Sequence, residues 1–439
     1  MKLVYSNLYK HSQYQSKISP NNYYVANAVD DRLVIRRQDR HLQVLQVHET
    51  RSPIDYIQWA PNSEHILTVN YQKSRVYIRS LTDPKWQGSI VERRFPIVRV
   101  RWSPDSKSIL CISELKLRLA IWNLSTQELK YMNHLKFIDK GIEFSPDGNY
   151  VAIVELIEGK EYISIYHANS FILLQRFEVD TADLENLIWS FDSMFIAVWD
   201  NCIYHKLLIY RQDGHLYKAY SGYQFGLGIK TVIWSPNNQL IAIGNYDETI
   251  HVLSALSFDL VDKLEHSASI AVHSNITPIE EIEAANPAKI SLGHVDTDYH
   301  ILVPPLKIPI RRPEYNEPNP KTGISSCQFS PDSQYLFSKS DSMPTALWLW
   351  KVNTLSCTHV IKFRKHIKQV LWHPQHNCLL TVICGDGNLH FFESTEDGMD
   401  IQPATVPTTR FSVKKIKWSS DGNALILMDQ ELFCLAVQE

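Results

Sequence analysis

The feature that most constrains the fold of this chain is a short pattern that returns nine times. In its fullest form the pattern is an aromatic residue followed by Ser-Pro, with two apolar residues seven and eight positions later. The anchors are Ile18, Trp59, Trp102, Phe144, Trp189, Trp234, Phe329, Trp372 and Trp418. Consecutive anchors lie 41, 43, 42, 45, 45, 95, 43 and 46 residues apart, so one interval is much longer than the others. A period near 43 residues is typical of units of four short strands.

Each unit reads as four antiparallel strands. The anchor ends the first strand, a turn such as Pro104-Asp105 follows, and the apolar pair begins the second strand. The third strand carries an apolar or aromatic marker, at Ile35, Ile78, Trp122, Tyr166, Tyr210, Leu253, Trp350 and Phe392. Flat four-stranded units must bury their faces against neighbours, and a closed ring of blades achieves this. We therefore predict an all-β fold, a single closed β-propeller with nine blades as the preferred number.

The long interval predicts a segment outside the regular repeats. Six prolines between positions 304 and 320 exclude a regular central strand there. We interpret residues 267–320 as a Pro-rich insertion between units one to six (residues 1–266) and units seven to nine (residues 321–439). A degenerate tenth blade is the alternative, because the extra length is close to one period.

The two ends of the chain are predicted to meet in one blade. The unit anchored at Trp418 runs out after Leu435, which is too early for a fourth strand. Residues 1–10 precede the first anchor's strand and have no other place in the pattern. We therefore expect residues 1–10 to supply the outer strand of the last blade, which would remove two exposed edges.

Composition and charge favour an intracellular protein that binds neither nucleic acid nor a membrane. The chain has 439 residues, 44% of them hydrophobic, and a net charge of -3. It lacks the basic stripe of a nucleic-acid-binding protein, and its basic clusters at 362–368 and 414–417 are interpreted as solvated strand edges. No signal peptide and no run of 18 apolar residues are present. The seven cysteines include no Cys-x-x-Cys pair and are expected to be reduced.

The sequence contains little that predicts catalysis. The glycine-rich stretch 222–230 does not fit the spacing of a phosphate-binding loop and leads into a strand, so we expect an ordinary loop. Metal-binding residue types gather in one region, at His373, His376, Cys378, Cys384 and His390. Since these positions fall in a turn and in strands of unit eight, blade packing is the preferred interpretation. We predict no enzyme activity, no cofactor and no metal site.

The most specific stretch of the chain lies in units five and six. It contains Phe177-Glu-Val-Asp-Thr-Ala-Asp-Leu184, Ile196-Ala-Val-Trp-Asp200, Tyr204-His-Lys-Leu-Leu-Ile-Tyr210, Tyr220-Ser-Gly-Tyr223 and Leu227-Gly-Ile-Lys230. This stretch resembles the centrosomal and spindle-pole WD-repeat protein family, and the similarity extends through most of the chain. The chain departs from ordinary WD repeats in having only 15 Gly and a single Trp-Asp pair, Trp199-Asp200, which falls at the end of a second strand.

The resemblance implies a function and partners. Members of this family sit at centrosomes or, in fungi, at spindle pole bodies. There they act with a coiled-coil adaptor protein and a minus-end-directed kinesin to anchor microtubule minus ends, so tubulin would be reached indirectly. The expected location is therefore the cytoplasm and cytoskeleton, at the spindle pole, with the nuclear side of the pole as one fungal setting.

Two other functions remain as alternatives. Nine-bladed propellers also resemble certain translation initiation factors, which should carry a basic surface facing RNA. A ubiquitin-ligase substrate receptor should carry Asp-x-Arg after a third-strand Trp, whereas Trp122 and Trp350 are followed by Asn-Leu-Ser and Lys-Val-Asn. An interaction scaffold at the spindle pole is the preferred function.

The candidate partner-binding residues come from the loops of units five and six. If each anchor ends the innermost strand, the loops that lead into first strands and those that join second to third strands share one face. We predict that the adaptor binds on this face, at Asp180, Asp183, Asp200, Tyr223, Phe225, Lys230 and Tyr246. The alternative is that these residues only brace neighbouring blades.

Overall fold

The computed structural model describes residues 3–93, 95–114, 118–272, 274–283, 297–313, 321–395, 398–406, 408 and 411–438. The named elements in these ranges are all β-strands. Within the same ranges, no helix has the length and hydropathy that a membrane span requires. The chain forms two compact units, one of residues 1–144, 148–178 and 406–439, called unit A here, and one of residues 145–147 and 179–405, called unit B.

Unit A holds five antiparallel blade sheets in its described residues. The first is β3 (Ser16–Ile18), β4 (Tyr24–Val29), β5 (Arg32–Arg37) and β6 (Val44–Glu49). The second is β7 (Tyr56–Trp59), β8 (His65–Asn70), β9 (Arg75–Ser80) and β10 (Gln87–Val91). The third is β11 (Ile97–Trp102), β12 (Ser108–Ser113), β13 (Arg118–Asn123) and β14 (Leu129–Asn133). The fourth is β15 (Ile142–Phe144), β16 (Tyr150–Ile157), β17 (Lys160–His167) and β18 (Leu173–Glu178).

The fifth sheet of unit A is the ninth blade, and it contains the first and the last described strands of the chain. It comprises β39 (Lys415–Trp418), β40 (Ala424–Met428) and β41 (Leu432–Gln438). The N-terminal strand β1 (Leu3–Tyr5) pairs antiparallel with β41 and forms the outer edge, and β2 (Tyr9–Lys10) pairs with another part of β41. The backbone N–H of Ser6 also donates to the carbonyl of Leu435 at 2.8 Å, so the N-terminal segment is fastened along β41.

Unit B holds blades five to eight in its described residues. Blade five is β19 (Leu184–Trp189), β20 (Phe195–Asp200), β21 (Leu207–Arg211) and β22 (Leu216–Tyr220). Blade six is β23 (Ile229–Trp234), β24 (Leu240–Asn245), β25 (Thr249–Ser254) and β26 (Leu260–Glu265). Blade seven is β31 (Ile324–Phe329), β32 (Tyr335–Ser340), β33 (Ala346–Lys351) and β34 (Ser356–Lys362). Blade eight is β35 (Gln369–Trp372), β36 (Leu379–Ile383), β37 (Asn388–Thr395) and β38 (Gly398–Thr405).

The inserted segment adds strands to blade seven. Strand β28 (Thr277–Glu283) pairs parallel with β34 and antiparallel with β29 (Thr297–Ile301), so the sheet order is β29-β28-β34-β33-β32-β31. Strands β27 (Ser269–Ile270) and β30 (Leu306–Lys307) form a separate pair. Residues 284–296 and 314–320 of the expected insertion lie outside the described residues. In the part that is described, the segment builds no four-stranded sheet of its own.

The anchor residues join neighbouring blades. Trp59 and Trp102 are buried, and their indole N–H groups donate to the carbonyls of Lys17 and Gln58 in the preceding first strands. In unit B the Trp372 indole donates to the Gln328 carbonyl at 3.1 Å in the same way. The apolar pairs after the anchors pack between the blades, as Leu67 does in the cluster that also contains Trp102. The repeat thus marks a buried apolar pair in each blade, and at Trp59, Trp102 and Trp372 the anchor adds a hydrogen bond to the preceding blade.

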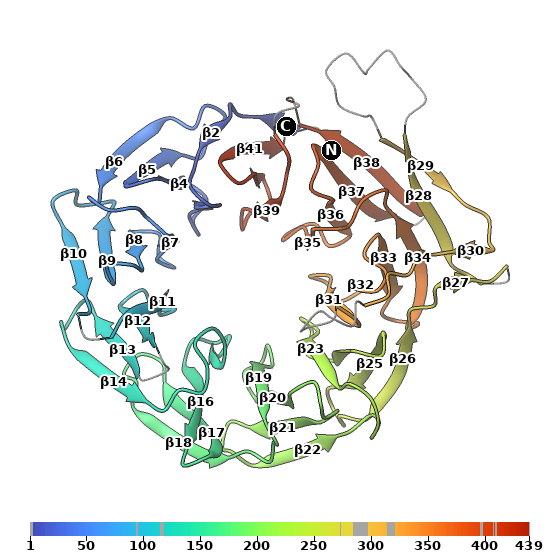
Figure 1. The fold of residues 1–439 in the computed structure, drawn as a ribbon, viewed down its shortest axis with the longest axis horizontal. Helices are drawn as coiled ribbons and strands as arrows, with labels where there is room; N and C mark the ends of the chain where they lie inside the picture. The colour runs from blue at the N-terminus through green and yellow to red at the C-terminus, as the bar shows by residue number, and fades with distance from the viewer. Residues whose placement is uncertain are drawn as a thin grey trace. The chain divides into compact units, whose positions relative to one another are not determined.

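In the view of Figure 1, β7, β11 and β39 lie along the concave side of unit A, and β6, β10, β14 and β18 lie along its convex side. In unit B the labelled strands β19, β23, β31 and β35 likewise lie on the concave side. First strands are therefore called inner and fourth strands outer below. The predicted fold class, an all-β propeller of nine blades, is confirmed by the nine blade sheets of the described residues.

Candidate functional site

A pocket of about 580 Å³ opens among the loops of blade five in unit B. Three connections form it: residues 179–183 before β19, residues 201–206 between β20 and β21, and residues 221–228 between β22 and β23. Its lining includes Asp180, Asp200, Ile203, Tyr204, His205, Lys206, Tyr220, Tyr223 and Gln224. The structure thus brings together three of the residues predicted from the sequence, Asp180, Asp200 and Tyr223.

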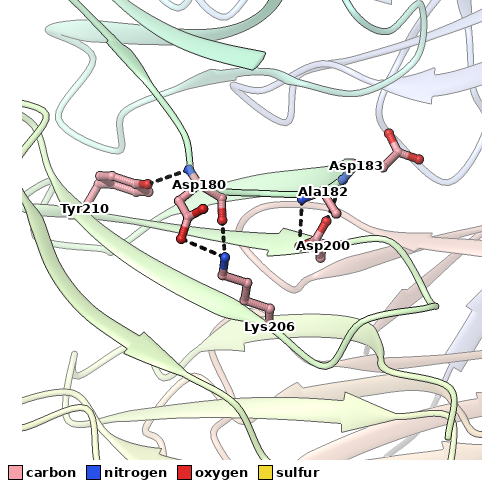
Figure 2. A network of polar contacts seen from close by, with 6 residues as sticks. All are labelled: Asp180, Ala182, Asp183, Asp200, Lys206 and Tyr210. Carbon is pink, nitrogen blue, oxygen red and sulfur yellow. Dashed lines mark hydrogen bonds and ion pairs between the residues drawn. The ribbon is translucent and has the colours of Figure 1, made fainter. Parts of the chain in front are cut away.

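Asp200 holds the first loop in place. It ends β20 and is only 1% exposed. Its two carboxylate oxygens accept the backbone N–H groups of Asp183 at 2.8 Å and Ala182 at 3.1 Å, as Figure 2 shows. Hydrogen bonds to a buried carboxylate are stronger than those between neutral groups. The buried Asp200 therefore holds the 179–183 loop in position. Asp183, on the same loop, is exposed to solvent.

Asp180 forms a second polar contact beside this loop (Figure 2). Its carboxylate pairs with the Lys206 ammonium at 2.8 Å, and the same ammonium donates to the Asp180 carbonyl. The Asp180 backbone N–H donates to the Tyr210 hydroxyl at 3.2 Å. The Asp180 side chain is well exposed, so a partner could compete for its charge.

Two buried histidines form the floor under the third loop. The Gly222 N–H donates to His205 Nδ1 at 3.0 Å, so the proton of the neutral ring lies on Nε2, which donates to Asn245 Oδ1 at 3.1 Å. The Tyr223 ring lies 4.4 Å from the His205 ring, between centroids. Burial lowers the pKa of His205, and burial together with the neighbouring His205 lowers the pKa of His251 to about 4. The floor is therefore uncharged at neutral pH.

Glycines allow the third loop to approach this floor. A Cβ on Gly222 would lie 2.7 Å from Cε1 of His251, and a Cβ on Gly228 would lie 2.4 Å from the Tyr204 carbonyl oxygen. Both distances are far below van der Waals contact. The glycine-rich stretch, expected from the sequence to be a loop, is one, and close packing requires its glycines.

Exposed apolar side chains, called the rim here, lie on two of the loops that form the pocket; Ile203 and Tyr204 also line the pocket, whereas Phe225 and Leu227 are outside its lining. Phe225 is 91% exposed, and Ile203, Tyr204 and Leu227 are also exposed. All four project from the loops 201–206 and 221–228. Large apolar side chains gathered on polar-lined loops are typical of protein interaction sites.

Lys230 and Tyr246 lie outside the pocket lining. The Lys230 ammonium donates to the Thr322 carbonyl and pairs with Asp341 at 2.8 Å, which ties blade six to blade seven. The same ammonium lies 5.2 Å from the centre of the Tyr246 ring. Lys230 has only 19% of its side chain exposed, so it acts here as a brace between blades.

The sequence prediction placed the loop between the second and third strands on the binding face, but it chose as candidates none of Ile203, Tyr204, His205 and Lys206, which this loop supplies. A signal was present, because apolar and aromatic residues occupy a short connection between two strands, where polar turn residues are usual.

The histidines and cysteines of blade eight have other surroundings. His373 Nδ1 accepts the backbone N–H of His376 at 2.7 Å in the turn, and His390 lies buried in the sheet. In the part of the chain that the structure describes, no group of three His, Cys, Asp or Glu side chains is placed to hold a metal ion.

Repeated four-stranded blades, each with an anchor residue at the end of its first strand, define the chain as a WD-repeat β-propeller protein. The C-terminal WD40 domain of Sif2 has the same kind of fold, with a TM-score of 0.53 and 12% sequence identity, covering 88% of this chain and 96% of that one. Such propellers are generally non-catalytic interaction scaffolds.

The chain is 32% identical over 451 residues to WD repeat-containing protein WRAP73 of Mus musculus. The aligned region covers 99% of this chain and 96% of the relative. It belongs to the WD repeat-containing protein family that includes WRAP73. It is also 23% identical over 313 residues to an uncharacterized WD repeat-containing protein of Schizosaccharomyces pombe, covering 68% of this chain and 62% of that protein. No protein-family model matches the chain.

Proposed function

We propose that this protein is a non-catalytic scaffold at the spindle pole body or centrosome. There it binds a coiled-coil adaptor through the blade-five pocket and, with a minus-end-directed kinesin, helps to anchor microtubule minus ends. The location and the partners rest on the family resemblance carried by residues 177–236. The observation that supports binding at this place is the apolar rim, Ile203, Tyr204, Phe225 and Leu227, around a pocket with a fixed polar floor.

The chemistry of the pocket fits a helical or short linear segment of a protein. The rim offers apolar contact area, while Asp180 and Lys206 offer one charge of each sign at the edge. The loops are held by Asp200 and His205, so little ordering entropy would be lost on binding. A coiled-coil protein presents such segments, with apolar residues on one side and charges on the other.

The experiment compares two double variants of the full chain as fluorescent fusions through mitosis. Phe225→Ala with Leu227→Ala removes two rim side chains and no hydrogen-bonding side chain. Leu256→Ala with Val303→Ala is the matched control, because both residues are highly exposed and lie in unit B away from the pocket. We expect the rim variant to lose most of its spindle-pole signal, at a binding cost on the order of 2 kcal/mol, and the control to keep it.

Both variants must melt at the wild-type temperature for this comparison. If the rim variant concentrates at the poles like the wild type, the binding site lies elsewhere on the protein. A wild-type fusion that never concentrates at spindle poles would overturn the proposed location itself.

A further inference from the structure

Strand β29 is the free edge of the extended sheet of blade seven. It stands at one end of the order β29-β28-β34-β33-β32-β31, and in the described part of the chain it pairs only with β28. Figure 1 shows β29 on the outer side of β28. An edge strand of this kind offers backbone N–H and C=O groups that can pair with a strand of another chain.

The extension that carries β29 is attached firmly to blades seven and eight. Strand β28 pairs with β34 through residues 277–280, and the Lys362 ammonium adds an ion pair with the Glu280 carboxylate at 2.6 Å. On β29 itself, the Tyr299 hydroxyl forms a hydrogen bond with Nδ1 of His390 in blade eight. The edge is therefore held in one place, so little conformational entropy would be lost when a second strand binds to it.

Two hydrogen bonds show which backbone groups of β29 point outward. The Leu302 N–H donates to the Pro278 carbonyl at 2.9 Å, so the even-numbered residues of β29 direct their backbone groups toward β28. The Tyr299 N–H points the other way and donates to Oδ1 of Asp298 at 2.8 Å. The backbone groups of residues 297, 299 and 301 are thus the ones that a second strand would meet.

The edge lacks the side chains that usually prevent pairing between chains. Other strands at sheet ends in unit B carry such residues, with Lys218 in β22, Lys263 in β26 and Pro403 in β38. Strand β29 has the sequence Thr-Asp-Tyr-His-Ile, without Lys or Pro, and its Ile301 is 73% exposed. Lysine and proline on an edge strand disfavour association, so β29 is open to it.

The charges of β29 complement those of a second copy of the same strand. When two copies run antiparallel with Tyr299 at the two-fold axis, Asp298 of each copy lies opposite His300 of the other. Both residues are exposed, and within the described residues neither forms an ion pair. Opposite residues of this type have Cα atoms about 4.5 Å apart, within reach of a hydrogen bond between imidazole and carboxylate. Centring the pair on Asp298 instead would place two carboxylates opposite each other.

We propose that β29 is the contact of a symmetric homodimer, in which it pairs antiparallel with β29 of a second copy, with Asp298 opposite His300 at two places. This pairing uses the free edge of both copies, so it ends at two chains. Five residues from each copy make a small contact, so the dimer is weak and the monomer predominates in dilute solution. The self-complementary charges favour a second copy over an unrelated strand.

The first test is sedimentation velocity of the full chain over a hundredfold range of concentration, where the average sedimentation coefficient should rise with concentration. Ile301→Pro removes an outward N–H and no bond to β28, so we expect the Kd of the dimer to rise at least tenfold. The matched control is Ile301→Val, which keeps the N–H and a β-branched side chain. Its Kd should change less than twofold.

A second pair of variants tests the register. His300→Asp places carboxylates opposite each other at both positions, so we expect the Kd to rise at least tenfold. The double variant Asp298→His with His300→Asp exchanges the two groups within each copy and restores an opposite pair across the axis. Its Kd should return to within about threefold of the wild-type value.

The inference is overturned if the wild-type chain stays monomeric at every concentration, which would leave the edge to an extended segment of another protein. It is also overturned if Ile301→Pro dimerises like the wild type, or if the exchanged variant dimerises as weakly as His300→Asp. Equal melting temperatures of the variants in dilute solution would show that a change in Kd is not a loss of folding.

Discussion

The phenol ring of Tyr223 lies against the imidazole of His205, with 4.4 Å between the two ring centroids. His205 is buried on the loop that follows β20, and Tyr223 stands on the loop that follows β22. The Tyr223 hydroxyl donates to the carbonyl of Leu227 within its own loop. One aromatic contact therefore fixes the exposed tip of the 221–228 loop, with Phe225 at its end, against the body of blade five.

The hydroxyl of Tyr223 is expected to stiffen this loop. Tyr223→Phe keeps the ring contact with His205 but leaves the Leu227 carbonyl without this donor, at a cost of about 0.5–1.5 kcal/mol. Amide hydrogen exchange at residues 224–228 should become faster, while exchange in β20 and β21 should not change. Equal exchange in the wild type and the variant would show that the hydroxyl does not order the loop.

Asp200 should matter far more for stability than the neighbouring Asp180. Asp200→Asn replaces one of two buried acceptor oxygens by a donor facing a backbone N–H, so we expect a loss of about 1–3 kcal/mol in the free energy of unfolding. Asp180→Asn removes only an exposed ion pair with Lys206, worth about 0–1 kcal/mol. Urea unfolding of the two variants gives the comparison, and equal losses would contradict the role assigned to Asp200.

The regular part of this fold was predictable because each blade repeats the same physical solution. Trp102 is buried at the end of its first strand, and a buried anchor at the same place in other blades, such as Trp59 and Trp372, produces a pattern that returns every 43 residues or so. The parallel pairing of β28 with β34 was not predictable from the sequence. Pro278 and the acidic residues that follow it do not form a pattern typical of a strand inside a sheet.

The site was predictable only in part, for a similar reason. Tyr223 and Phe225 are visible in the sequence as aromatics on a loop. Whether a polar side chain is free to contact a partner depends on residues that are distant in the sequence. The Lys230 ammonium, for example, bonds to the carboxylate of Asp341, 111 positions along the chain. No local pattern encodes that contact.

Lys230 is expected to stabilise the contact between blades six and seven. Replacing Lys230 by Met leaves the partly buried Asp341 carboxylate without its ion pair, and replacing Asp341 by Asn leaves the ammonium without its own. Each single variant should lose about 1–3 kcal/mol, and a double-mutant cycle should give a coupling energy above about 0.5 kcal/mol. Zero coupling would mean that the two groups act independently, and Lys230 would again be a candidate for direct contact with a partner.

Buried histidines should make the protein sensitive to acid. His266 Nε2 accepts the hydroxyl of Ser338 at 2.6 Å, Nδ1 donates to the Glu248 carbonyl at 2.7 Å, and burial lowers the pKa of the ring to about 4. Between that pKa and the ordinary value of 6.5 the unfolded state binds the extra proton, so stability present above pH 6.5 is lost as the pH falls toward 4. The maximum slope for one group is about 1.4 kcal/mol per pH unit.

The matched variant for this prediction is His266→Gln, whose amide can reproduce both hydrogen bonds without titrating. Melting temperatures measured from pH 7 to pH 5 should fall less steeply in His266→Gln than in the wild type. The other histidines with a lowered pKa act in the same direction and remain in both proteins; they are His11, His48, His65, His205, His251, His359 and His390. Parallel curves would show that His266 does not contribute to the acid sensitivity.

The N-terminal segment should protect the last blade from association. Deleting residues 1–10 removes β1 and β2 and leaves the backbone groups along one side of β41 without their ladder partners. An exposed edge of this kind pairs with other chains, so we expect the truncated protein to form oligomers in light scattering and to melt several degrees lower. A synthetic peptide of residues 1–10 added in excess should restore the monomer, because it can pair with the same edge. A truncated protein that stays monomeric with an unchanged melting temperature would show that β41 does not need this partner.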